Sequence, residues 1–141
     1  MKIKIINGPN LNLLGTREPE VYGSTSFVDY FKQLKAAFPK IEFDYFQSNV
    51  EGELINALHE ANTKGQHVVL NGAGFTHTSI ALADAVAAIQ VTVVEVHISN
   101  IYAREEIRHT SLTGKNCLGV ITGFGLNGYN LAIEALLAQN S

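Results

Sequence analysis

Two side chains that could take part in acid–base catalysis, Glu95 and His97, lie two positions apart in the segment EVHISN (95–100). If this segment is a strand, residues two apart lie on one face, so the carboxylate lies beside the imidazole. Such a carboxylate fixes the tautomer of the histidine and favours its charged form, which can donate a proton. The pair therefore predicts a general acid. A purely structural ion pair stays open, because such pairs also occur without function.

A second candidate region is the segment NGPNLNLLGTREPEVYG (7–23), which contains Asn10, Arg17 and Tyr22. The segment is long for a loop between a strand and a helix, which usually has about 2–6 residues. With Gly15 and Gly23 in it, it is typical of a hinged lid over a site. A simple turn is the alternative, because Gly, Pro and Asn are common turn formers.

Further polar residues follow in NGAGFTHTS (71–79) and in the charged run around residues 104–109. Asn71 and His77 are candidates for ligand contacts, although His77 could equally be a residue at a helix start that bonds to backbone. A solvated helix face explains most of the charged run. Arg108 alone is expected to reach a site.

Short β-type runs alternate with helix-type periods along the chain. Strands are predicted at 2–7, 41–46, 67–71, 91–98 and 117–122, and helices at 25–38, 51–64, 76–90 and about 126–139, with a possible helical turn at 103–108. Strict alternation implies right-handed crossovers and a parallel sheet that helices cover on both faces. The prediction is one α/β domain over residues 1–141, with a flavodoxin-like five-stranded sheet of order 2-1-3-4-5.

In that strand order the candidate residues converge. Ligands of such sheets bind outside the carboxyl ends of the strands, near the point where the strand order reverses. Strands one, three and four are neighbours there, so their ends bring together Asn10, Arg17, Tyr22, Asn71, His77, Glu95, His97 and Ser99.

Composition narrows the classes of partner. Charged residues make up 16 % of the chain, below the roughly 25 % that is usual for soluble domains, which favours an oligomer with buried helix faces. A net charge of -3 gives no electrostatic case for nucleic acid. No apolar run reaches the ~18 residues of a membrane span, and no signal peptide opens the chain, so a cytoplasmic protein is expected.

The lone Cys117 is expected to be a buried packing residue.

The segments NGPNLNLLGTREPEVYG, NGAGFTHTS, EVHISNIYAREEIR and the final GFGLNGY closely resemble type II dehydroquinase, in the order in which that family carries them. The resemblance implies the dehydration of 3-dehydroquinate to 3-dehydroshikimate by anti elimination through an enolate, in the shikimate pathway or in quinate catabolism. It also implies a homododecamer built as a tetramer of trimers, without metal ion or organic cofactor.

The resemblance further implies a role for each candidate residue. For the chemistry, it implies that Tyr22 is the base and His97 the acid, with Glu95 beside it. Arg17 stabilises charge next to Tyr22, and Asn10 helps to hold a water that supports the enolate. For substrate binding, it implies that the carboxylate is held by Asn71 and the backbone amides of Ile98 and Ser99, that ring hydroxyls are held by His77 and Arg108, and that Asp84 reaches the site of a neighbouring subunit.

These residue types suit the reaction. A free tyrosine has a pKa of about 10, so only about one part in a thousand is phenolate at neutral pH. An adjacent arginine lowers the pKa of an acidic group by roughly 1–3 units, which makes the phenolate accessible. An enolate route needs no lysine, because no Schiff base forms.

Three other classes stay open on the sequence. An FMN-binding flavodoxin-like module would need a hydroxyl-rich phosphate loop after strand one, yet no Ser or Thr occurs there before Thr16. A non-enzymatic receiver-like signalling module would need an aspartate where Asn71 stands. A zinc hydrolase built on His77, Glu95 and His97 would lack a recognised metal spacing.

Overall fold

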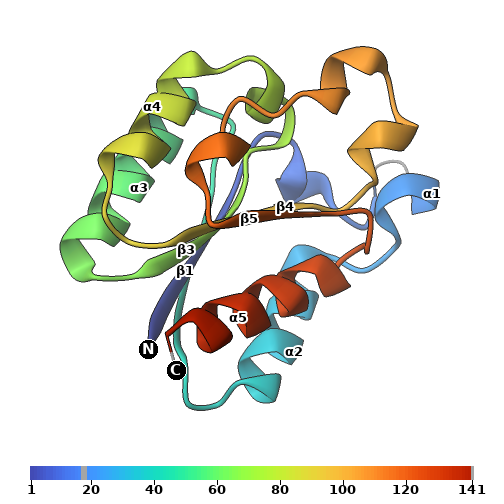
Figure 1. The fold of residues 1–141 in the computed structure, drawn as a ribbon. Coiled ribbons are helices and arrows are strands. Elements are labelled where there is room, and N and C mark those ends of the chain that lie inside the picture. The colour runs from blue at the N-terminus through green and yellow to red at the C-terminus, as the bar shows by residue number, and fades with distance from the viewer. Residues whose placement is uncertain (17–18, 141) are drawn as a thin grey trace.

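The structure is a computed structural model that describes residues 1–16 and 19–140, apart from the side chains of residues 21 and 22. Within that part of the chain, five strands form one sheet: β1 (Lys2–Asn7), β2 (Glu42–Gln47), β3 (His67–Asn71), β4 (Val93–His97) and β5 (Gly119–Thr122). The strand order is β2-β1-β3-β4-β5 and every pairing is parallel. The predicted flavodoxin-like sheet is therefore confirmed (Figure 1).

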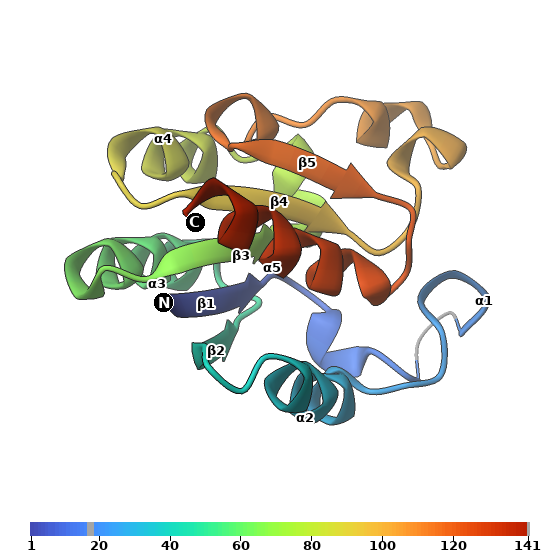
Figure 2. The ribbon, with the colours of Figure 1, turned by 60° about the horizontal axis from the view of Figure 1, so that its bottom comes forward.

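Four longer helices cover the two faces of the sheet. The helices α2 (Phe27–Ala37) and α5 (Asn127–Gln139) lie on one face, and α3 (Glu51–Lys64) and α4 (Ile80–Ala88) on the other. Figure 2 shows α5 in front of the strands and α2 below β2. The short helix α1 (Pro19–Tyr22) lies beyond the carboxyl ends of the strands (Figure 1).

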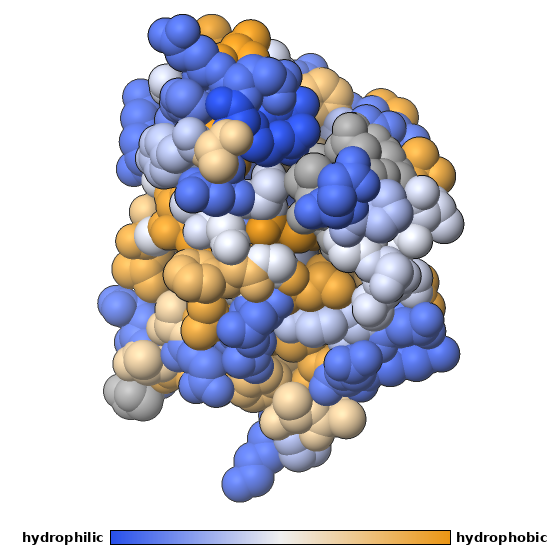
Figure 3. Space-filling view, turned by 90° about the vertical axis from the view of Figure 1, so that its right-hand side faces the viewer, coloured by the Kyte–Doolittle hydropathy of each residue, from blue (hydrophilic) through white to orange (hydrophobic). Residues whose placement is uncertain are grey.

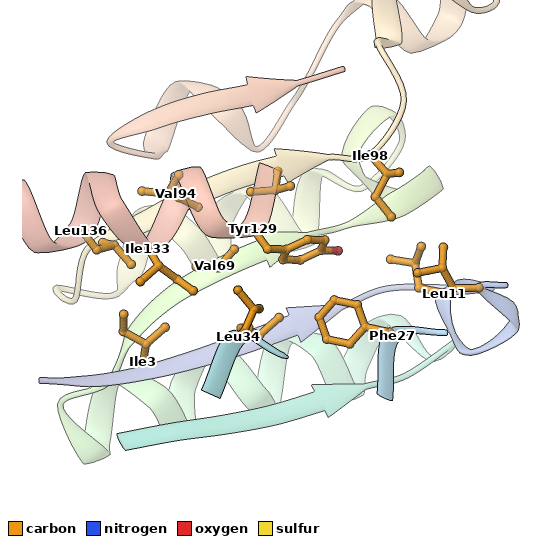
Figure 4. Packing of buried hydrophobic residues seen from close by; sticks show 14 residues of the cluster. Ile3, Leu11, Phe27, Leu34, Val69, Val94, Ile98, Tyr129, Ile133 and Leu136 are labelled. Carbon is orange, nitrogen blue, oxygen red and sulfur yellow. The ribbon is translucent and has the colours of Figure 1, made fainter. Parts of the chain in front are cut away.

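Each face of the sheet carries its own hydrophobic cluster. Along β3, Val69 packs into the cluster below α2 and α5, whereas Val68 and Leu70 pack into the cluster below α3 and α4. The first cluster contains Phe27 and Tyr129, whose rings meet edge to face with centroids 4.9 Å apart (Figure 4). Both faces of β3 are buried, so its middle residues Val68, Val69 and Leu70 are all apolar, as is usual in parallel sheets.

The main departures from the predicted boundaries lie near the carboxyl edge. The helix predicted at 76–90 begins only at Ile80, where Ser79 Oγ caps it by accepting the Leu82 amide at 2.9 Å. A 3₁₀ helix, η2 (Ala73–His77), precedes it, because Asn71 Oδ1 accepts the Ala73 amide at 3.0 Å and bends the chain out of the strand.

Other short 3₁₀ helices fill the connections around this edge: η1 (Leu11–Leu13), η3 (Ile101–Ala103), η4 (Glu106–His109) and η5 (Gly114–Asn116). The turn predicted at 103–108 is thus two separate elements, η3 and η4. The last strand is shorter than predicted because η5 leads into it. Cys117 lies half-buried against the α3 and α4 cluster, and burial raises the pKa of its thiol to about 12. Among the described residues, no helix has the length and apolarity of a membrane span.

Candidate active site

A pocket opens where β1, β3 and β4 end, at the point where the chain direction across the sheet reverses. Seven predicted residues line it: Asn10, Asn71, His77, His97, Ile98, Ser99 and Arg108. Figure 3 faces this end of the molecule and shows hydrophilic side chains gathered over its upper part. The site therefore forms where ligands of doubly wound sheets usually bind.

The loops after β1 and β3 meet closely beneath this pocket. The Gly8 amide donates to the Asn71 carbonyl at 2.8 Å. A Cβ atom on Gly8 would lie 2.7 Å from the Gly72 carbonyl oxygen, so only glycine allows this approach. Asn10, two residues later, has a left-handed backbone with φ 70°, and its amide donates to Asn49 Oδ1 at 3.0 Å. The two loops form one rigid wall of the pocket.

Glu95 and His97 form the predicted contact on one face of β4. His97 Nε2 lies 2.8 Å from Glu95 Oε2, and both side chains are buried. Burial raises the pKa of the Glu95 carboxyl, but hydrogen bonds from His97, Thr113 and Ser111 outweigh burial and hold that pKa below its ordinary value. Glu95 is therefore a carboxylate. Because a carboxylate only accepts hydrogen bonds, His97 Nε2 carries a proton and Nδ1 is the nitrogen left for a bound molecule.

His77 lies beside His97, with the two ring centroids 6.0 Å apart and the rings 27° from parallel. His77 Nδ1 lies 2.9 Å from the Thr110 carbonyl oxygen, which only accepts, so Nδ1 carries the proton. Burial lowers the pKa of His77, against a smaller opposite effect of this hydrogen bond. His77 is thus both bonded to backbone and part of the pocket, and its neutral ring offers Nε2 as an acceptor for a hydroxyl.

Asn71 is fixed in place by its neighbours. Its Oδ1 accepts from the Ala73 amide, and its Nδ2 donates to the Tyr129 hydroxyl at 3.0 Å. That hydroxyl donates in turn to Asn7 Oδ1 at 2.8 Å. Tyr129 is fully buried beneath the pocket on α5. The second hydrogen of Asn71 Nδ2 is the donor that the side chain can offer to a ligand.

Two arginines give the pocket a positive rim. Arg108 Nε donates to Glu105 Oε1 at 3.0 Å. Arg104 also lines the pocket, half-buried, with Nη1 3.5 Å from Ser99 Oγ. The expectation that Arg108 alone of the charged run reaches the site was therefore wrong. The irregular backbone at this point carries no periodicity that would reveal which way Arg104 points.

Three predicted residues do not enter this geometry. Arg17 lies outside the described residues. Tyr22 ends α1, and its side chain lies outside what the structure describes. Asp84 is exposed on α4 and does not line the pocket of its own chain.

Sequence reasoning missed the hydroxyls around Glu95, from Ser111 and Thr113. A usable signal existed, because a buried carboxylate needs donors and the chain after it is rich in Ser and Thr. Among the described residues, no group of three or more His, Cys, Asp or Glu side chains is placed to hold a metal ion.

Comparison with known proteins gives a consistent result. The family model described as Dehydroquinase class II matches residues 1–137. The 3-dehydroquinate dehydratase of Pelodictyon phaeoclathratiforme is 52 % identical, with 100 % of this chain and 95 % of that protein covered. The protein of the same name from an Exiguobacterium species is 53 % identical, with 97 % and 94 % covered. The crystal structure of type II dehydroquinase from Propionibacterium acnes superposes with a TM-score of 0.93 at 39 % identity, with 97 % and 96 % covered.

Proposed function

Because this chain belongs to the class II dehydroquinase family, we propose that it is a hydro-lyase that converts 3-dehydroquinate to 3-dehydroshikimate. The observation that carries the proposal is the buried Glu95–His97 pair, which opens onto a pocket with a positive rim. The substrate is an anionic hydroxy-ketone, and the pocket has matching chemistry: cations for the carboxylate, a neutral histidine for a hydroxyl, and an acid for the leaving group.

The carboxylate of the substrate determines its orientation. Asn71 Nδ2 and the backbone amides of Ile98 and Ser99 hold this group at the ends of β3 and β4. Arg104 adds positive charge nearby, and charge-assisted hydrogen bonds of this kind are roughly twice as strong as neutral ones. His77 and Arg108 hold ring hydroxyls. The immobilised Asn71 side chain makes this site preorganised, which saves the ordering cost on binding.

The reaction proceeds by proton loss and then by loss of hydroxide as water. Tyr22, as phenolate next to Arg17, takes a proton from the carbon beside the ketone. The electron pair of that C–H bond forms an enolate, which a water held by Asn10 supports. The enolate then collapses, the C–O bond of the leaving hydroxyl breaks, and His97 donates the proton that makes it water. Base and acid act from opposite faces of the ring, so the elimination is anti.

Glu95 holds a proton on His97 Nε2, so the proton that His97 donates leaves from Nδ1. No step needs an imine or an oxidant, so we propose an enzyme without metal ion or organic cofactor, in which residues 1–141 form one catalytic domain in the cytoplasm.

We also propose that the active form is a homododecamer, a tetramer of trimers, in which Asp84 of one chain reaches the pocket of its neighbour. The low charged fraction and the exposed position of Asp84 on α4 support this assembly. Sedimentation in dilute buffer should give a mass close to twelve chains. A stable and fully active monomer would contradict it.

The experiment that tests the function is a turnover assay with purified protein and 3-dehydroquinate, read by the ultraviolet absorbance of the conjugated enone product. His97→Ala should lower turnover by about 10²–10⁴ fold, the usual contribution of a general acid. Substrate binding should persist, because the carboxylate contacts lie elsewhere. His59→Ala, on the exposed side of α3, is the matched control and should leave turnover unchanged. Absence of product with the wild type would refute the function.

A further inference from the structure

Glu95 is surrounded by hydroxyl donors that come from one short segment of the chain. Its side chain is entirely buried on β4. Besides His97 Nε2, Ser111 Oγ donates to Oε2 at 2.8 Å and Thr113 Oγ1 donates to Oε1. Thr113 is itself entirely buried. Both carboxylate oxygens are thus engaged, in a place that water cannot reach.

The backbone fixes the direction of these hydroxyls. The Gly114 amide donates to Ser111 Oγ at 2.9 Å, which occupies an acceptor position of that oxygen and leaves its proton for Glu95. A Cβ atom on Gly114 would lie 3.4 Å from Glu95 Oε2 and 3.0 Å from Ser111 Oγ, so the segment fits tightly around the carboxylate. The segment 111–114 therefore forms a cradle built around one acceptor group.

A carboxylate that is buried needs compensation, because desolvation favours its neutral form. If Glu95 were protonated, its hydroxyl could donate to His97 Nε2, and that nitrogen would then be an acceptor without a proton. With two hydroxyl donors in place, Glu95 stays a carboxylate that also accepts from His97 Nε2. The hydroxyls thus act on the chemistry through Glu95, without touching the pocket themselves.

We propose that Ser111 and Thr113 are positioning residues that keep Glu95 ionised and thereby keep a proton on His97 Nε2, so that Nδ1 is the nitrogen from which His97 gives the acid proton. The effect on the pH dependence of turnover rests on the proposed function. The effect on the ionisation of Glu95 can be tested without any assumption about the substrate.

The pH dependence follows from the direction of the Glu95 shift. The titratable groups that face Glu95 are His97 on its own strand, His77 on η2 and Cys117 before β5. The hydrogen bonds lower the pKa of Glu95, so the carboxylate persists until the pH falls through that lowered value. Removing one donor raises the pKa of Glu95. Activity should then be lost at a higher pH on the acid side of the rate profile.

Thr113→Val removes the hydroxyl and keeps the shape of the side chain. The acid limb of the kcat profile should move up by about one to two pH units, the worth of one hydrogen bond to a charged group. Activity on the alkaline side of this limb should change little. Thr113→Ser restores the hydroxyl and should restore the wild-type limb. Ser111→Ala, at a half-buried position, should move the limb in the same direction even if Thr113→Val does not fold.

Two controls separate this role from simple packing. Thr76→Val removes another entirely buried threonine, whose Oγ1 makes no hydrogen bond within the described part of the chain, and should leave the limb in place. In the Glu95→Gln background no carboxylate remains to titrate, so adding Thr113→Val should cause no further movement. A defect that is equal at all pH values, or that persists in the Glu95→Gln background, overturns the proposal.

A second experiment measures the free energy of unfolding by denaturant as a function of pH, with no substrate present. Because the folded-state pKa of Glu95 is lowered, its contribution to stability is present above the unfolded-state pKa and is lost as pH falls through the folded-state value. In Thr113→Val this contribution should be smaller, and its loss should be complete at a higher pH, than in the wild type and in Thr76→Val. Identical pH dependence in all three proteins overturns the proposal. If the wild type fails to dehydrate 3-dehydroquinate, the proposed function falls, and this experiment still decides the role of the hydroxyls.

Discussion

Replacing Tyr129 by phenylalanine tests whether the base of the pocket is held by hydrogen bonds or only by packing. The aromatic ring packs against Phe27 and stays in the variant, so little apolar contact is lost. Only the hydroxyl disappears. That hydroxyl donates to Asn7 Oδ1 at 2.8 Å and accepts from Asn71 Nδ2 at 3.0 Å, in a place that is fully buried.

The expected magnitude follows from the two partners that remain. Asn7 loses a donor and Asn71 loses an acceptor, and each unsatisfied buried polar group costs about 1–3 kcal/mol. Since the two groups share one site, the costs do not simply add, and we expect a loss of about 2–4 kcal/mol in the free energy of unfolding. Burial also raises the pKa of Tyr129, so the hydroxyl is a neutral donor at every working pH.

The assay combines urea unfolding at fixed protein concentration with steady-state kinetics. In the variant only the Ala73 amide still holds the Asn71 side chain, so KM for the substrate should rise by about tenfold, a loss of about 1.4 kcal/mol in binding, while kcat changes less. Tyr102→Phe removes a hydroxyl from a side chain that is 64 % exposed and should stay within about 0.5 kcal/mol of wild type. If Tyr129→Phe matches Tyr102→Phe in stability and in KM, the proposed support of Asn71 is wrong.

The remaining predictions concern the base and the absence of other catalytic groups. Tyr22→Phe should lower turnover by at least about 10² fold while the substrate still binds, and retention of more than a tenth of the activity would exclude Tyr22 as the base. Arg17→Lys should also be severely slow, because lysine lacks the planar fork that can hold phenolate and substrate together. Arg17→Ala should raise the pH at which the base becomes active, because the phenolate loses its nearby cation. Activity should persist in strong chelator, and borohydride with substrate should leave the enzyme active; a trapped adduct would indicate an imine mechanism instead.

The fold was largely predictable because its signals are periodic. The runs at 2–7, 51–64 and 67–71 have the bounds that the structure gives to β1, α3 and β3. The bounds of α4 were not predictable in the same way. The Ala-rich run at 76–90 has helical composition throughout, but the Asn71 and Ser79 side chains bond to the local backbone and delay the helix start to Ile80. Such capping choices depend on which backbone groups tertiary contacts leave unpaired.

The site was predictable where strand geometry positions the residues. Glu95 and His97 lie together because alternate residues of a strand share a face. Arg104, Ser111 and Thr113 escaped prediction because they lie between short 3₁₀ helices, where no regular period relates sequence position to direction. Their positions are determined by tertiary contacts with Glu95 and with the rim of the pocket, and these contacts exist only in the folded chain.

The stereochemical course of proton loss tests the central claim most directly, because an enolate formed by a base on one ring face and an acid on the other leaves a specific trace. Two substrates are needed, each with deuterium at one of the two hydrogens beside the ketone, and the product of each is analysed by mass spectrometry. Anti elimination predicts that the deuterium opposite the leaving hydroxyl is lost, and that the deuterium on the same side is retained. Loss of the hydrogen on the same side as the hydroxyl would contradict the proposed arrangement of base and acid.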